Sequence, residues 1–315
     1  MQQELPSSLI CVAPGCTNPR WQDHNGDYNQ FCSKRCRNAN LHLQNATVAG
    51  AGAASASTEA AENVQPGLGP NACVICKTAP YDATRKSLFC DISCAQRSME
   101  MAPGIIEIPQ SHPQFTDISN QFQTKWRHTN VPFKPAKHIY FILISAASEA
   151  AYVAYRTKVE QEGNFLKRGW TEGNQSRRFY GATRQCMLGD PGNTELCPNQ
   201  TCDLCEIIRT SFDLQFQRGQ TGSGSSGYEL YTSATSSKSD SYTTNKTPSP
   251  LKAMLMTKVV VGRGYKMTQD DTTRTAPPPG YHSVLREPDE AGSLGYDEVV
   301  VYDNDAIRPT YLIVY

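Results

Sequence analysis

The apolar residues of this chain gather in short runs within its C-terminal half. The runs "HIYFILIS" (138–145), "AMLMTKVVVG" (253–262), "DEVVVYD" (297–303) and "PTYLIVY" (309–315) are rich in β-branched and aromatic residues. A shorter run, "RRFYGAT" (177–183), contains a glycine near its end. Short runs of this composition, bounded by turn residues, are typical of buried strands. We therefore predict a strand at each of these places.

Two further segments have the composition and spacing of helices. In "SEAAYVAYRTKVEQEG" (148–163) the apolar residues recur at helical spacing, and Ser148 is the expected N-cap. "LCEIIRTSFDLQF" (204–216) is predicted to be helical as well. Strands mixed with few helices and short connections predict an α+β fold with a mostly antiparallel sheet. This domain is expected to cover 136–315, a length sufficient for its own hydrophobic core.

The cysteines form a second pattern, because all twelve fall into three groups of four. Pairs of cysteines on short loops can direct four thiolates at one tetrahedral zinc ion, with bonds of about 2.3 Å. We predict closed structural zinc sites, although the first two groups could be buried or redox-active thiols and Cys186 an ordinary core thiol. The groups are Cys11, Cys16, Cys32 and Cys36, then Cys73, Cys76, Cys90 and Cys94, then Cys186, Cys197, Cys202 and Cys205.

The N-terminal part of the chain contains little apolar sequence, and small modules of this kind need a metal in order to fold. We predict one tetracysteine zinc module at 1–44 and a second at 71–102. The segment 45–70 between them is small and polar, so it is expected to be a flexible linker. A proline-containing connector at 103–135 leads into the main domain.

The charge of the chain is balanced, with 30 basic and 30 acidic residues, so no overall field attracts it to nucleic acid or to an anionic membrane. The apolar run "IYFILI" (139–144) is far shorter than the roughly 20 residues needed to cross a bilayer. The first residues show no secretory signal pattern. We therefore expect an intracellular protein, nuclear or cytoplasmic, in a reducing compartment where clustered cysteines favour metal over disulfides.

The segment "YTSATSSKSDSY" (231–242) is rich in serine and threonine and has a tyrosine at each end. Composition alone favours a surface loop. The same residues would also suit a pocket wall, in which a ring stacks on a flat ligand and a hydroxyl holds its polar edge.

Three motifs in this part of the chain occur in a specific order. The serine-rich segment contains Tyr-x7-Ser-x2-Tyr with a lysine before the serine, at Tyr231, Lys238, Ser239 and Tyr242. Later, Glu298 is followed by three valines and Tyr-Asp. The third motif, which comes first along the chain, is "FYGAT" (179–183). Together, over about 180 residues, they resemble the catalytic domain of poly(ADP-ribose) polymerases and related ADP-ribosyltransferases.

The resemblance implies a mostly antiparallel, split sheet with a pocket for the nicotinamide end of NAD. Glu298 would hold the ribose 2′-hydroxyl and stabilise the oxocarbenium-like transition state, with Tyr231 and Tyr242 stacking on the ring. Gly181 would bind the carboxamide through its backbone, and Ser239 through its hydroxyl. The catalytic residues that the resemblance implies are Glu298, Tyr231 and Tyr180. Tyr180 stands where the family usually has histidine, and its phenol could fill the pocket. Arg184 could meet the pyrophosphate or be a surface arginine.

The function implied by the resemblance is transfer of a single ADP-ribose unit from NAD to a protein or nucleic-acid acceptor, with release of nicotinamide. Two alternatives stay open at this point. The chain could be an NAD glycohydrolase, with water as the acceptor. It could also be a catalytically degenerate transferase fold that acts as a binding module.

Overall fold

The structure is a computed structural model, and it describes residues 72–81, 87–214, 229–267, 271, 274–287 and 297–315. The first cysteine group, the predicted module at 1–44 and the predicted linker lie outside these residues. Residues Pro66–Tyr315 form one compact unit, and the description below concerns this unit.

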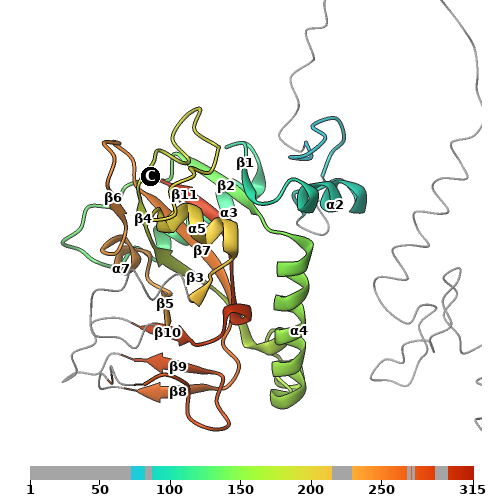
Figure 1. Cartoon of the computed structure of the whole chain (residues 1–315), viewed down its shortest axis with the longest axis vertical. Coiled ribbons are helices and arrows are strands. Elements are labelled where there is room, and N and C mark those ends of the chain that lie inside the picture. Colours follow the sequence, from blue (N-terminus) through green and yellow to red (C-terminus); the bar gives the residue numbers. More distant parts are fainter. Residues whose placement is uncertain (1–71, 82–86, 215–228, 268–270, 272–273, 288–296) are drawn as a thin grey trace, which may run out of the picture. The chain divides into compact units, whose positions relative to one another are not determined.

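A mixed, mostly antiparallel sheet is the centre of the fold (Figure 1). In the described part of the chain it has nine strands, in the order β1-β2-β11-β7-β3-β5-β10-β9-β8, and β8 and β9 are parallel. A separate parallel pair consists of β4 (Thr183–Arg184) and β6 (Thr244–Asn245). The predicted α+β class with a mostly antiparallel sheet is thus confirmed. The nine strands are β1 (Gly104–Glu107), β2 (His138–Leu143), β3 (Gln175–Gly181), β5 (Leu230–Ser233), β7 (Ala253–Val260), β8 (Gly264–Met267), β9 (Ser283–Arg286), β10 (Glu298–Val301) and β11 (Ile307–Val314).

The pairing of β3 with its two neighbours is very uneven. Along β7, its register runs from Gln175 opposite Val260 to Gly181 opposite Met254. Its register with β5 consists of one pair, Phe179 opposite Ser233. The strands β5, β10, β9 and β8 are therefore joined to the rest of the sheet at a single point.

The helices of the described residues are short apart from α4. Ser145, rather than the predicted Ser148, caps α4, because its hydroxyl accepts a hydrogen bond from the Ser148 amide and so brings three more residues into the helix. The predicted helix at 204–216 ends early, since Ser211 and Phe212 have positive φ angles of 59° and 70°. The helices are α2 (Ile92–Glu100), α3 (Pro113–Thr124), α4 (Ala146–Gly163), α5 (Asp203–Thr210) and α7 (Ser236–Asp240), with 3₁₀ turns η3 (Leu166–Arg168), η4 (Glu172–Asn174) and η5 (Asn304–Ala306).

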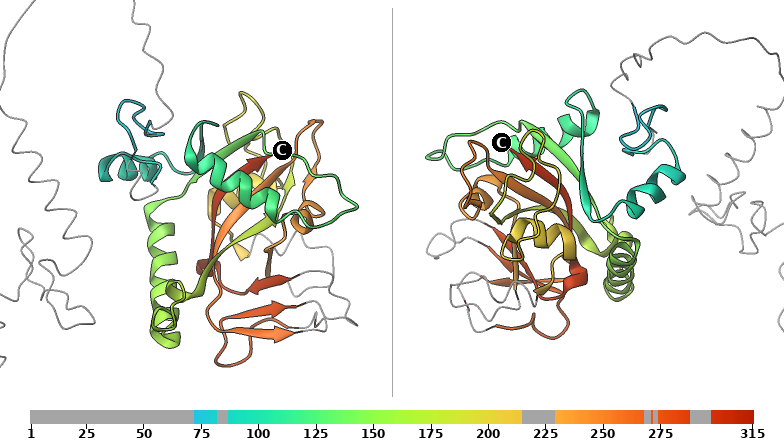
Figure 2. Two further views of the ribbon diagram at one scale, coloured as in Figure 1. Left: turned by 180° about the vertical axis from the view of Figure 1, so that it is seen from behind. Right: turned by 45° about the horizontal axis from the view of Figure 1, so that its top comes forward.

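Two hydrophobic cores cover the two faces of the sheet, because side chains alternate along each strand. We call them the α5-side core and the α3-side core. Figure 1 and Figure 2 show α5 on one face of the sheet and α3 on the other. The α5-side core includes Ile207, Ile208, Leu255, Val259, Val299 and Val301. The α3-side core includes Ile118, Phe122, Phe179, Met254, Met256 and Ile313.

The second cysteine segment packs directly on this domain. Val74 and Leu88 belong to the α3-side core, and the ring of Phe89 meets that of Phe141 edge to face with centroids 5.7 Å apart. The segment therefore shares a core with strand β2 of the sheet.

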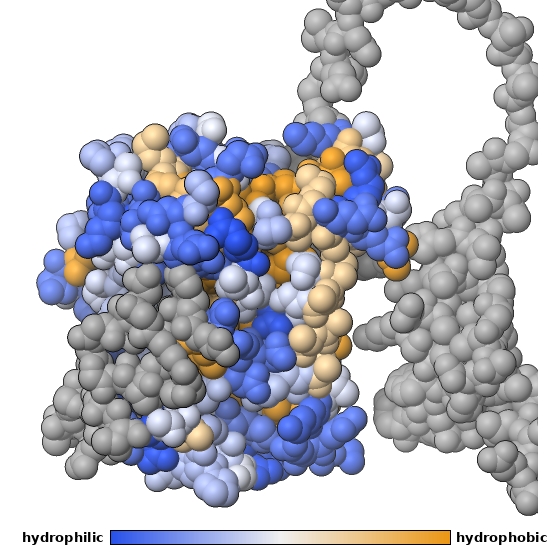
Figure 3. Space-filling view, viewed as in Figure 1, coloured by the Kyte–Doolittle hydropathy of each residue, from blue (hydrophilic) through white to orange (hydrophobic). Residues whose placement is uncertain are grey.

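The outer surface of α4 is mildly apolar, and it is seen as a pale stripe in the space-filling view (Figure 3). Its exposed residues Ala146, Ala147, Ala150, Val153 and Ala154 recur at helical spacing on one face. The buried residues Tyr152 and Val159 lie on the inner side of the helix.

Candidate active site and metal centres

The serine-rich segment folds into strand β5 and the short helix α7, and its small residues let α7 pack closely against backbone. Ser236, Ser237 and Ser239 are buried. The Ser236 hydroxyl donates to the carbonyl of Phe122 at 2.7 Å, near the end of α3. The Ser237 hydroxyl accepts from the amides of Arg127 and His128, each at 3.0 Å. Two of the serines are thus used to hold α7 in place.

Gly181, at the end of β3, lies against the other side of α7. A Cβ atom on this residue would lie 2.2 Å from the carbonyl oxygen of Ser239 and 2.9 Å from Cβ of Tyr242. Real Cβ atoms do not approach this closely, so glycine is required by the backbone contact. Three predicted ligand-binding residues therefore lie together, with the Tyr242 ring largely exposed.

Glu298 begins strand β10 and is almost completely buried. Its Oε1 lies 2.9 Å from Nζ of Lys238 on α7, and its Oε2 lies 3.1 Å from Nη1 of Arg286 on β9. The strand register explains one of these contacts, since Glu298 stands directly opposite Arg286 and, on its other side, opposite Ser233. We call Glu298, Lys238, Arg286 and Tyr231 the Glu298 cluster.

Tyr231 is joined to the cluster through Arg286. The Arg286 guanidinium lies over its ring, 5.3 Å from the centroid, and the phenol donates to Oε2 of Glu229 at 2.8 Å. Burial and then the bond to Glu229 raise the pKa of Tyr231. Partial burial and then the negative charge of Glu298 raise the pKa of Tyr242. Tyr231 is thus linked to Glu298 through Arg286, and Tyr242 is influenced by the charge of Glu298.

Tyr180 and Arg184 lie in other surroundings. The Tyr180 ring packs on the α5-side core and meets Phe212 edge to face at 5.0 Å, and burial raises the pKa of its hydroxyl. Arg184 is fully buried, and it donates to Asp190 Oδ1 at 2.8 Å and to the carbonyls of Leu188 and Leu251. Arg184 is therefore part of a structural network rather than a surface residue.

Sequence reasoning missed Arg286. It lies in no motif, and only the register of β9 and β10 places it opposite Glu298. A usable signal was the short run "SVLR" (283–286), which precedes the predicted strand of Glu298 by ten residues in a mostly antiparallel sheet.

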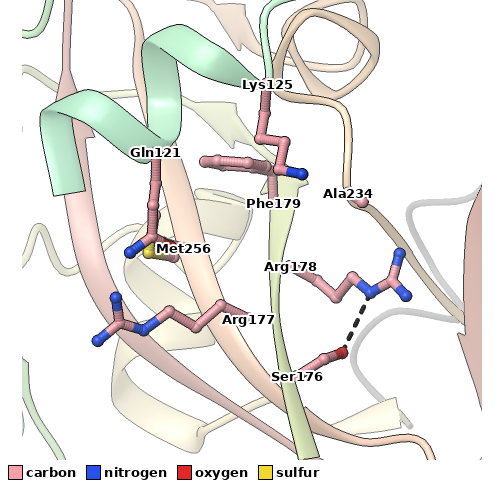
Figure 4. A pocket seen from close by; sticks show the side chains of 8 residues that line it. All are labelled: Gln121, Lys125, Ser176, Arg177, Arg178, Phe179, Ala234 and Met256. Carbon is pink, nitrogen blue, oxygen red and sulfur yellow. Dashed lines mark hydrogen bonds between the residues drawn. The ribbon is translucent and has the colours of Figure 1, made fainter. Parts of the chain in front are cut away.

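The structure also shows a cavity of about 230 Å³, and no residue of the Glu298 cluster lines it (Figure 4). Arg178 is ion-paired with Asp297 at 2.6 Å, and Asp297 directly precedes Glu298. Arg177 is paired with Asp117 at 2.8 Å. Figure 4 shows Arg177 and Arg178 pointing in opposite directions from β3, with the Arg178 Nε bonded to Ser176. The lining residues are Gln121, Lys125, Ser176, Arg177, Arg178, Phe179, Ala234 and Met256.

Two of the three predicted cysteine groups fall within the described residues, and both have the geometry of a metal site. In each group all four sulfurs lie within 4.8 Å of one another. Cys186 lies 3.6 Å from Cys205 and 3.9 Å from Cys202, sulfur to sulfur. Four thiolates about 2.3 Å from a tetrahedral zinc ion would lie about 3.8 Å apart. Both groups could therefore hold a metal such as zinc, and Cys186 lies with the other three thiols of its group.

The thiols of the second group differ, since burial raises the pKa of Cys90 and of Cys94. Hydrogen bonds from Thr78 lower the pKa of Cys76 to about 6. Asp91 caps α2 by accepting from the amide of Cys94, so that Cys90 and Cys94 flank the start of a helix. A thiolate, rather than a thiol, is the species that binds zinc.

Comparison with known proteins identifies no family, so the class of this protein is defined by its fold and its candidate metal sites. No model of a protein family matches the chain, and no curated protein matches it. None of the described helices is both long and apolar enough to cross a membrane. Within the described residues, the molecule is an α+β protein with a mostly antiparallel sheet and two tetracysteine clusters.

Proposed function

We propose that this protein transfers a single ADP-ribose unit from NAD to a protein or nucleic-acid acceptor and releases nicotinamide. The observation that carries the proposal is the position of Glu298. This buried carboxylate is ion-paired with Lys238 of the serine motif, while Ser239, the next residue, lies against Gly181 of the third motif. Helix α7 thus contacts both of the other motif segments, one through Lys238 and the other through Ser239. The resemblance to ADP-ribosyltransferases supports the same assignment.

The proposed chemistry begins when the bond between nicotinamide and ribose breaks. Positive charge then develops on the ribose, and a fixed carboxylate such as Glu298 stabilises the transition state more than the ground state. The ion pair with Lys238 holds this carboxylate in position before substrate arrives. Preorganisation of this kind avoids a reorganisation cost during the reaction.

The remaining residues have roles in binding. Tyr231 and Tyr242 offer aromatic faces to the nicotinamide ring, and Gly181 and Ser239 bind its carboxamide. Tyr180 has no binding role in this proposal, since its ring packs against Phe212 on the side of the sheet that Val299 and Val301 face. The single-pair junction of β3 and β5 supports a split sheet of the transferase type. Both tetracysteine clusters hold structural zinc in this proposal.

The test is to incubate the full chain with NAD and to measure nicotinamide, together with ADP-ribose attached to added protein or nucleic acid. Glu298→Gln is expected to lower nicotinamide release by two to three orders of magnitude, by analogy with the loss of one transition-state hydrogen-bond donor. Glu287→Gln is the matched control, because it makes the same chemical change at an exposed carboxylate directly after strand β9.

Folding must be separated from chemistry in this experiment, since Glu298→Gln leaves Lys238 and Arg286 with a neutral partner. Glu298→Asp keeps the charge and withdraws it by one methylene, so a folded Glu298→Asp variant with slow release assigns the loss to position. Equal rates in the parent and in Glu298→Gln would contradict the proposal.

A second candidate is a binding module for ADP-ribose-like ligands, and one observation favours it. Both oxygens of Glu298 are already engaged by cations in this structure. Ligand binding without nicotinamide release under any acceptor condition would support this alternative. Free ADP-ribose as the sole product would instead indicate an NAD glycohydrolase.

A further inference from the structure

The Arg286 side chain lies at a position with two unlike partners. On one side its guanidinium faces the ring of Tyr231, 5.3 Å from the centroid. On the other side its Nη1 lies 3.1 Å from Oε2 of Glu298. The side chain is only 12% exposed, so the group is held within the site rather than in solvent.

The chemistry of this position matches the part of NAD that the proposed function brings there. A guanidinium is planar, delocalised and positively charged, and it stacks readily on aromatic rings. The nicotinamide ring of NAD is also planar and positively charged. Each would use an aromatic face and a nearby carboxylate as partners, so the two groups compete for one place.

We propose that Arg286 occupies the position of the nicotinamide ring over Tyr231 and determines how tightly the site binds that ring. This inference rests on the proposed function. The substrate must displace the guanidinium before its own ring can stack, which weakens the binding of NAD. Arg286 is therefore a specificity-determining residue, and Tyr231 and Glu298 are the groups for which the two cations compete.

Displacement of the side chain is compatible with the fold. The backbone of Arg286 is fixed by its pairing with Glu298 in β10 and with Met267 in β8. The exchange therefore involves rotation of a long side chain, with no change in the sheet. When Arg286 leaves, Glu298 keeps its ion pair with Lys238 at 2.9 Å, so the buried carboxylate is never left without a cation.

The inference is tested by titrating the full chain with 1-methylnicotinamide, a free ring with the same charge as that of NAD, in a calorimeter. Arg286→Ala is expected to bind this ring about tenfold more tightly than the parent, from the loss of a competing desolvated cation–π contact. Arg286→Lys keeps the charge but not the plane, and intermediate affinity is expected. Lys266→Ala, which removes an exposed cation from the adjacent strand β8, is the control and should bind like the parent.

The outcomes separate this inference from the function on which it rests. If the parent releases nicotinamide from NAD but Arg286→Ala binds the ring with equal or lower affinity, the inference is overturned and the proposed function stands. If Arg286→Ala binds more tightly and Lys266→Ala does not, the inference is supported. If no variant binds the ring or cleaves NAD, both are overturned.

Discussion

Replacement of Gly181 by alanine tests whether close contact between β3 and α7 builds the site. The added Cβ would lie 2.2 Å from the Ser239 carbonyl oxygen and 3.0 Å from the amide nitrogen of Thr243. These are backbone atoms, so they cannot avoid the methyl group by a change of rotamer. Since a carbon–oxygen contact needs about 3.3 Å, the backbone at Ser239 must retreat by about 1 Å.

The consequences follow from the position of α7. Overpacking of this kind typically costs about 1–3 kcal/mol. For a domain of this size, we expect the melting temperature to fall by roughly 3–9 °C. The shift also moves Lys238, the neighbour of Ser239, away from Glu298, so nicotinamide release should fall by more than the loss of folded protein explains.

The assay compares thermal melts and NAD cleavage, both measured on Gly181→Ala and on Gly104→Ala. Gly104 is a suitable control because its added Cβ would meet its nearest atoms at 3.5 and 3.8 Å, which are ordinary contacts. A Gly181→Ala protein with the melting temperature and activity of the parent would refute the reasoning, since it would show that α7 does not rest on this glycine.

Three further predictions concern metal content and stability. Cys205→Ser should lose one zinc equivalent relative to the parent, measured by metal analysis, because its group would keep three of four thiolate ligands; an unchanged zinc content would contradict this. Arg184→Met should lower the free energy of unfolding in denaturant by about 3–5 kcal/mol, because it leaves Asp190 buried without its cation. Adding Asp190→Leu in the same chain should recover part of this loss. A loss below about 1 kcal/mol would count against the network. Burial lowers the pKa of His112 from its ordinary value of 6.5, so the unfolded state takes up a proton more readily and stability should fall as pH drops below 6.5. His112→Asn, which can still cap α3, should show a smaller fall in melting temperature over the same pH range. An identical pH profile in the two proteins would contradict the assignment.

The strongly apolar strands could be predicted from the sequence, and the weakly apolar ones could not. The runs that form β2, β7 and β11 pack in the core, so their composition indicates their structure. Strand β8 (Gly264–Met267) is half exposed and is recognisable mainly through its pairing with β9. Pairing between distant segments leaves little trace in a single sequence.

The same limit applies to the site. The resemblance singled out Tyr231, Ser239, Tyr242 and Glu298 as candidates, because its motifs consist of short intervals along the chain. Arg286 depends on a cross-strand register, which composition does not encode. The burial of Arg184 likewise depends on backbone carbonyls that come from 188 and 251.

The hydrogen bonds that α3 and the residues after it make to α7 have a practical consequence for fragments of this protein. The carbonyls of Phe122 and Lys125 and the amides of Arg127 and His128 all bond to residues 236 and 237. A shortened version starting at 136 would lack every one of these supports, although it would contain each motif residue. We expect such a fragment to bind its ligand poorly even when soluble, and a start before 72 to be the safer choice for expression.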